Sequence, residues 1–313
     1  MKKYKRKSTE QIMKEVTGIV IEGLKKGQIP WRKPWASASI GGAPQNYNHK
    51  TNYHGSNTII LTSIMMAREY TTNFWVTYKG AKDLGGNVKR GERGYPVVYW
   101  KFIEKEEVTD GVIETVKIPF LRQFTVFNLD QLEGIEMPKK PKKSPVKPLK
   151  VIAEAEEVVT NYVEREENLT LEVKTSNRAY FSPSNDKIVC PTIRQHVEEA
   201  KENGQSVTDG KQHYYSTMFH EMVHSTGTKE RCNREGVTKP IHFGDHEYSK
   251  EELVAEIGSA ILSSKLGLIS DRVIENKQAY LNSWISRLES NPKWIIWAGG
   301  RSERAVKYIL NES

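Results

Sequence analysis

The chain has 313 residues, 37% hydrophobic and 27% charged, which is the composition of a soluble globular protein of one or two domains. No apolar run reaches membrane-spanning length, and the basic residues 1–7 are followed by polar residues, unlike the apolar core of a secretion signal. We therefore expect a cytoplasmic protein without a membrane partner. The net charge of +8 favours an anionic partner, although many basic proteins bind none.

The first half of the chain is expected to form a small α+β domain with an antiparallel sheet, covering residues 1–136. A capping box at 8–11 begins an amphipathic helix that Gly27 ends, and a second, short helix is expected at 58–68. Runs of β-type residues predict strands at 95–102, 112–118 and 121–128.

Aromatic and basic residues are interleaved throughout this first domain. Proteins that bind single-stranded nucleic acid combine a basic groove with aromatic rings on which the bases stack. The alternative is that most of the rings form the core of a small domain, and Trp75 and Trp100, inside apolar runs, fit that description. Residues in loops are the better candidates for DNA contacts, and we select Trp31, Arg32, Lys33, Trp35, Tyr53, Lys79, Lys89, Arg90 and Arg93.

Residues 137–150 are expected to be a linker. Prolines and lysines alternate there with almost nothing to bury, a composition typical of an extended tether. Residues 151–313 then form a second domain rich in helix. Within it, residues 178–190 are expected to form a hairpin with a turn in its middle.

The sequence His220-Glu221-Met-Val-His224 is the strongest functional signal in the chain. Histidines four residues apart lie on one face of a helix, where both imidazoles can bind one zinc ion. Glu221 lies beside them, where it can act on a water molecule. The alternative is an ordinary helix that carries two hydrogen-bonded histidines, so a third ligand is needed.

We expect that third ligand at Glu252, on a helix that begins at Ser249. Glu256 would then accept the free ring N–H of a ligand histidine, as bound imidazoles usually require. The structural alternative is that Glu252 forms a capping box with Ser249. Other candidate ligands are His242, Asp245 and His246.

Two histidines and one carboxylate leave a fourth position for water, the arrangement of a catalytic zinc site. Zinc lowers the pKa of its water toward neutrality, and Glu221 is the expected base that accepts the proton. An edge strand of the hairpin at 178–190 would hold an extended peptide. The residue that stabilises the oxyanion stays open among Tyr248, His246 and His213.

Several motifs together resemble the ArdC-type antirestriction proteins. In the first half these include Pro30-Trp-Arg-Lys-Pro-Trp35, Tyr53-x-Gly-x-Asn57 and Arg90-Gly-Glu-Arg-Gly94; in the second, His220-Glu-x-x-His224 and Glu251-Glu-Leu-Val-Ala-Glu-Ile-Gly258. The resemblance covers nearly the whole chain except the linker. One departure is Ser225, where many relatives carry tryptophan.

The resemblance implies a protein of a plasmid, phage or other mobile element, acting in the cytoplasm of a bacterial host. Its N-terminal domain would bind single-stranded DNA and shield it from restriction enzymes. The second domain would be a zincin-like metallopeptidase with His220, His224 and Glu252 as ligands and Glu221 as base. A different hypothesis is an active zinc endopeptidase that uses DNA binding to find a host protein, and a third is a binding module with a structural zinc site. The presence of Glu221 argues against the third.

Overall fold

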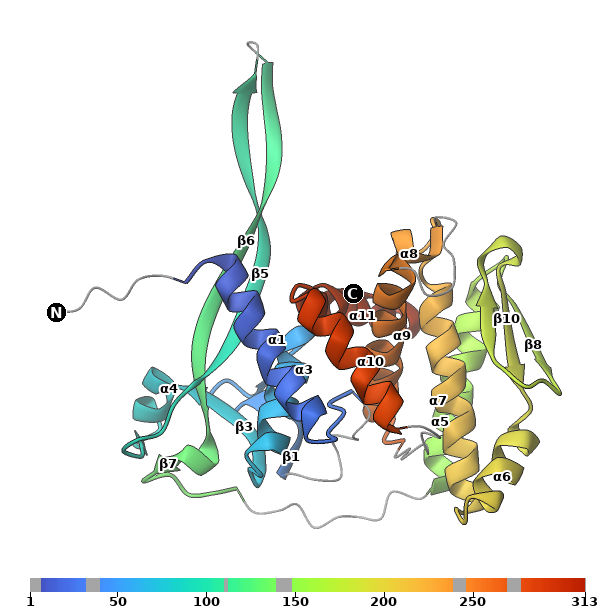
Figure 1. Cartoon of the computed structure of the whole chain (residues 1–313), viewed down its shortest axis with the longest axis horizontal. Coiled ribbons are helices and arrows are strands. Elements are labelled where there is room, and N and C mark those ends of the chain that lie inside the picture. The colour runs from blue at the N-terminus through green and yellow to red at the C-terminus, as the bar shows by residue number, and fades with distance from the viewer. Residues whose placement is uncertain are drawn as a thin grey trace.

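The structure, a computed structural model, describes residues 7–31, 40–109, 112–138, 148–238, 246–268 and 277–312 (Figure 1). The first helix, α1 (Thr9–Lys25), begins with the capping box that the sequence predicts. The Ser8 hydroxyl accepts a hydrogen bond from the Gln11 N–H at 3.2 Å, and the Gln11 side chain accepts one from the Ser8 N–H at 2.8 Å. Its apolar stripe is buried because it faces α3 (Ser56–Ala67) and α10 (Lys277–Ser290).

A five-stranded sheet forms the centre of the first half, in the order β2-β1-β3-β6-β5. The predicted antiparallel sheet is wrong at one pair, because β1 runs parallel to β3. The two strands predicted at 112–118 and 121–128 are one long strand, whose hairpin with β5 extends away from the rest of the chain (Figure 1). The strands are β1 (Ile40–Asn46), β2 (Thr51–Asn52), β3 (Thr72–Thr77), β5 (Tyr95–Thr109) and β6 (Val112–Asn128).

The two faces of this sheet are covered differently. Trp75 points to the main core, which includes α1 and α3, whereas Phe74 and Val76 point to a smaller apolar cluster, as alternation along a strand requires. That second cluster lies under α4 (Tyr78–Asp83), β4 (Asn87–Val88), a short helix (Leu129–Gln131) and β7 (Leu132–Glu133). Trp75 is fully buried, as predicted for a core residue.

Helices dominate the second half, as the sequence predicts. A three-stranded sheet, β8-β10-β9, lies beside them, and β9 pairs antiparallel with β10 around the expected turn. The elements are α5 (Pro148–Arg165), β8 (Thr170–Lys174), β9 (Tyr180–Ser182), η2 (Pro183–Asn185), β10 (Lys187–Pro191), α6 (Ile193–Glu202), α7 (Val207–Ser225), α8 (Glu235–Thr238), α9 (His246–Lys265), α10 and α11 (Trp294–Leu310).

The central helix of this half is α7, which packs closely against α6 and α9. A Cβ added to Gly258 on α9 would lie 2.8 Å from a methyl carbon of Val223 on α7, so this glycine lets the two helices approach each other. A Cβ on Gly210 would lie 2.5 Å from the Val197 Cα of α6. These contacts fix the faces that α7 and α9 turn toward each other.

The two halves share a continuous hydrophobic core across the described residues. Thr17 on α1 donates a hydrogen bond to the Pro292 carbonyl at 2.7 Å, and Trp31 packs edge-on against Trp284 of α10. Most of the predicted linker, residues 139–147, lies outside the described residues, and α5 already begins at Pro148. In the described part of the chain, no helix is both long and apolar enough to span a membrane.

Candidate metal centre

The helix that carries both histidines, α7, is anchored at both ends. At its start the Ser206 hydroxyl and the Asp209 carboxylate form a capping box. Near its end Phe219, Met222 and Val223 are fully buried, so the rotation of the helix about its axis is fixed. His220 and His224 therefore leave the helix together on the face that turns toward α9.

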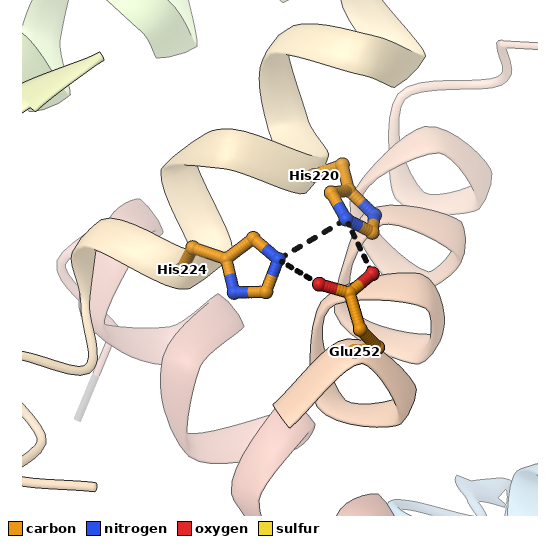
Figure 2. Close-up of side chains that lie close together, drawn as sticks. All are labelled: His220, His224 and Glu252. Atoms are coloured by element: carbon orange, nitrogen blue, oxygen red, sulfur yellow. Dashed lines mark hydrogen bonds and ion pairs between the residues drawn. The ribbon is translucent and has the colours of Figure 1, made fainter. Parts of the chain in front are cut away.

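Three side chains from two helices converge at this place (Figure 2). The Nε2 atoms of His220 and His224 lie 3.1 Å apart. The Glu252 carboxylate, on α9, lies 3.6 Å from His220 Nε2 and 3.3 Å from His224 Nε2. The structure thus brings Glu252 to the histidines, as the sequence predicts.

The capping-box alternative for Glu252 does not fit the structure. Helix α9 begins at His246, so Ser249 lies inside its first turn and is not the N-cap residue. The predicted start of this helix was therefore wrong by three residues. The Glu252 carboxylate instead lies beside both histidines of α7.

The donor atoms fit a divalent metal ion in both chemistry and spacing. Ligands held about 2.0–2.1 Å from a tetrahedral ion lie about 3.3–3.4 Å from each other. The two Nε2 atoms lie 3.1 Å apart, and the two oxygens of the Glu252 carboxylate each approach one of them, Oε1 at 3.3 Å from His224 and Oε2 at 3.6 Å from His220, so all three separations are close to that edge length. Two imidazoles and one carboxylate are also the donor set of catalytic zinc sites.

The carboxylate that orients a ligand histidine is Glu251, which the sequence did not single out. Its Oε1 atom lies 3.3 Å from His224 Nδ1, so it accepts the N–H on the ring nitrogen that faces away from the ligand cluster. The prediction gave such a role to Glu256 without saying which ligand histidine it would support; at His224 the partner is Glu251. Glu251 and Glu252 are neighbours on α9, yet one supports the His224 ring and the other is the candidate metal ligand.

Arg234 holds Glu251 in place. Its Nε and Nη2 atoms donate to the Glu251 carboxylate at 2.9 and 2.7 Å, and both side chains are almost fully buried. The same guanidinium donates to the Val223 carbonyl at 2.6 Å and to the Thr226 hydroxyl at 2.7 Å. Arg234 therefore ties the C-terminal turn of α7 to α9, the two elements that carry the ligand cluster.

Ser225, where the resemblance leads one to expect tryptophan, is fully buried and hydrogen-bonded. Its hydroxyl donates to the Met222 carbonyl at 2.8 Å and lies 2.8 Å from the Tyr162 hydroxyl on α5. Arg231 donates to the Ser225 carbonyl at 2.8 Å and pairs with Glu166 and Asp186. Ser225 is thus part of the packing behind α7 and does not touch the ligand atoms.

The charges around the cluster shift the pKa values of its members in opposite directions. Burial alone would lower the pKa of His224, but the carboxylates of Glu251 and Glu252 outweigh it and raise that pKa well above 6.5. Burial opposes ionisation of Glu252, yet both histidines hold its pKa below the ordinary value. These opposite shifts favour an ion pair between His224 and the neighbouring carboxylates.

Of the remaining candidates for catalysis, the structure describes the side chains of Glu221 and His213. Glu221 is 7% exposed and lies next to His220 on α7. His213 is buried two turns before His220. The side chains of His246 and Tyr248, and residues 239–245 with His242 and Asp245, lie outside the described residues.

The residues predicted to contact DNA that the structure describes do not form one patch. Trp31 is 1% exposed, its ring packs on Trp284 and its N–H lies 3.2 Å from the Tyr280 hydroxyl. The predicted stacking role of Trp31 is therefore wrong, because its ring offers no free face to a base. Arg32, Lys33 and Trp35 lie outside the described residues.

The other predicted contacts lie on different parts of the first half. Tyr53 is partly buried at the start of α3, next to the second half. Lys79 lies on α4, and Lys89 and Arg90 follow β4, so these cations belong to the opposite side of the sheet. Arg93 is exposed in the turn before β5.

Comparison with known proteins gives two matching family models and two structures of one relative. The models are the N-terminal domain of anti-restriction factor ArdC, over residues 10–127, and a zincin-like metallopeptidase, over residues 158–301. The metal-free crystal structure of antirestriction protein ArdC from plasmid R388 is 30% identical, with a TM-score of 0.67, covering 96% of this chain and 98% of that one. The Mn(II)-bound structure of that protein is 29% identical, with the same TM-score, and covers 96% and 97% of the two chains.

Similar sequences also occur within longer proteins. Two Escherichia coli proteins named DNA primase TraC are 34% and 33% identical over 93% and 95% of this chain. The chain spans only 19% and 27% of their lengths. A protein from Sinorhizobium fredii, uncharacterized protein y4eC, is 26% identical over 95% of this chain and 91% of its own length.

Proposed function

This chain belongs to the ArdC family of antirestriction proteins, and from that premise we propose that it binds single-stranded DNA and carries a zinc-dependent peptidase centre. The convergence of His220, His224 and Glu252 carries the second part of the proposal. Glu221 supports it, because a purely structural ion would need no base beside it.

The residues have separate roles in the proposed hydrolysis. A divalent ion held by His220, His224 and Glu252 would supply Lewis-acid polarisation of a carbonyl group. Glu221 accepts the proton of the attacking water and returns it to the leaving amine. Glu251 keeps the His224 ring oriented through its Nδ1 atom. Strand β9, an edge of the three-stranded sheet in contact with α7, is the candidate for holding an extended peptide.

Zinc is the ion that we propose for this site. Two imidazoles and one carboxylate form a donor set of zinc hydrolases, and a glutamate base next to the first histidine accompanies it in those enzymes. The Mn(II)-bound relative supports occupation of such a site by a divalent ion. Direct measurement of the metal bound to the purified chain would distinguish zinc from manganese.

The DNA-binding part of the proposal is supported by family membership and by charge. The chain has a net charge of +8, and Lys79, Lys89, Arg90 and Arg93 are all exposed in the first half. Surface cations of this kind contact phosphates, and the affinity for DNA then depends steeply on the salt concentration. We place the action of the protein in the cytoplasm of a bacterium that carries the mobile element.

The competing function is an endopeptidase that cleaves a DNA-associated host protein. The Glu221→Ala variant separates the two, because it removes the proposed base and none of the three ligands. We expect it to keep its metal, its affinity for single-stranded DNA and its protection of incoming DNA against a restriction enzyme, while any peptidase activity disappears. Loss of DNA protection together with intact DNA binding would favour the endopeptidase.

A further inference from the structure

A groove of about 1180 Å³ lies between the two halves of the chain. One wall is formed by the start of α3, by β2 and by the outer strand β5; the other is formed by α11 and by residues 232–234. Neither half encloses this space alone. A ligand in the groove would therefore touch both.

The two walls are held together by a close backbone contact. Gly55 has a φ of 56°, and a Cβ on it would lie 3.2 Å from the Gly299 carbonyl oxygen on α11. A Cβ on Gly299 would lie 2.4 Å from the Ser56 nitrogen. Glu303 on α11 accepts a hydrogen bond from the Gly55 N–H at 3.3 Å and lies 3.2 Å from His54 Nδ1. The groove is thus a fixed feature of the fold.

The α11 wall is cationic. Arg301 and Arg304 are exposed there, one and two turns after Trp297, and Arg301 lies over the Trp297 ring at 4.0 Å. No carboxylate of a described residue forms an ion pair with either arginine. Burial, followed by repulsion from Arg234, lowers the pKa of Arg301, and the carboxylates of Glu251 and Glu235 offset only part of this shift. An anionic ligand would relieve this repulsion.

The opposite wall offers aromatic surface. Tyr99 on β5 and Phe124 on β6 are 53% and 39% exposed, which is unusual for rings of this size. Tyr53 also lines the groove, and Trp297 faces them from α11. Rings on both walls and cations on one are the combination that holds single-stranded nucleic acid.

A peptide fits this groove less well. An extended peptide would bind by adding a strand to the free edge of β5. At the groove, Asn57 already occupies that edge, because its side chain accepts from the Val98 N–H and donates to the Val98 carbonyl, both at 2.8 Å. A peptide therefore finds these backbone groups blocked.

We propose that a single-stranded nucleic acid lies in this groove, with Arg301 and Arg304 contacting phosphates and Trp297 stacking on a base. The inference rests on the proposed binding of single-stranded DNA, and it moves the contact from the N-terminal domain alone to both halves. It makes the C-terminal helix a DNA-binding element.

The test uses the full-length chain and a fluorescently labelled oligothymidylate of about 16 nucleotides, the upper range of one binding site. For single strands, each phosphate contact changes the slope of log K against log salt by about 0.7. The Arg301→Ala/Arg304→Ala variant should therefore lower the magnitude of this slope by about 1.4. The ratio of the affinity of the unsubstituted chain to that of the variant should then be roughly 25-fold larger at 0.1 M salt than at 1 M salt. The matched control is Arg194→Ala, an exposed arginine on α6 outside the groove, which should change neither.

Trp297 is tested by two substitutions. Trp297→Phe keeps a stacking ring and should bind nearly as well as the unsubstituted chain, whereas Trp297→Leu should bind about 10-fold more weakly. Thermal unfolding of both variants shows whether the fold is intact.

The outcomes separate this inference from the proposed function. If the double arginine variant binds DNA tightly with an unchanged salt slope, the groove is not the DNA site, and the proposed DNA binding is unaffected. Absence of DNA binding by the unsubstituted chain would overturn both. Binding of an acidic peptide at the groove in place of DNA, lost in the same variants, would reject the nucleic acid as occupant.

Discussion

The role of Glu251 gives the sharpest prediction about the metal centre. Glu251→Gln keeps the shape of the side chain but removes its charge, which leaves Arg234 buried without a counter-ion. Breaking a buried ion pair in this way costs about 3–5 kcal/mol. A domain of this size loses about 2–4 °C in Tm for each kcal/mol, so we expect a decrease of roughly 6–20 °C.

The same substitution should weaken metal binding. The amide oxygen of the variant can still accept the Nδ1–H of His224, 3.3 Å away. It lacks the negative charge with which the carboxylate holds the ring so that Nε2 points at the metal. Loss of such a supporting partner usually lowers metal affinity about 10–100-fold. Calorimetric titration with Zn²⁺ or Mn²⁺, at a temperature well below the Tm of the variant, measures this effect apart from stability.

The control is Glu230→Gln, the same chemical change at an exposed position after α7, for which we expect no change in either quantity. Glu256→Gln provides the decisive comparison. If Glu256→Gln weakened metal binding and Glu251→Gln did not, the assignment of Glu251 as the supporting residue would be refuted.

Two further predictions follow from the site and from the domain contact. Because the pKa of His224 is raised above 6.5 in the metal-free chain, the metal must displace a proton, so affinity for Zn²⁺ should keep rising with pH above 6.5, by up to about tenfold per unit; an affinity that is constant between pH 6 and 8 would contradict this. Gly55→Ala should destabilise the chain by about 1–3 kcal/mol, because φ is 56° and the Gly299 carbonyl lies 3.2 Å from the new Cβ. Gly300→Ala, with no atom within 4 Å of its Cβ, is the control, and equal Tm values for the two variants would contradict the argument.

Local patterns predicted the helices well. The capping box at Ser8 and the histidine spacing at 220 and 224 act over one helical turn, so the residues that define them are adjacent in the sequence. The α+β class and the helical second half follow from the same kind of pattern. The parallel pairing of β1 with β3 could not be predicted in this way, because it depends on a chain path through α3 that places both strands side by side.

Local sequence patterns do not identify the residue that supports the metal ligands. Glu251 and Glu252 lie on the second turn of α9 and Glu256 on the third, and hydrophobic periodicity gives the buried face without distinguishing a ligand from a supporting residue. That distinction depends on Arg234, which approaches from the loop after α7 and claims Glu251. A guanidinium within a core needs a carboxylate partner, but the burial of Arg234 is seen only in the structure.

Trp31 was predicted to contact DNA and is instead buried by a distant part of the chain. A tryptophan between basic residues in a proline-rich loop is typical of a base-stacking platform, and only the contact with Trp284, 253 residues later, makes it a core residue. Trp297 is its counterpart, because its position on an amphipathic helix is typical of a core residue, yet it lines a groove. Both assignments depend on how α1 and α3 pack against α10 and α11, and the contact between Gly55 and Gly299 fixes that packing. The aromatic residues available to DNA are therefore determined by the interface between the halves, which is why variants at this interface should change DNA affinity without altering any residue that touches the strand.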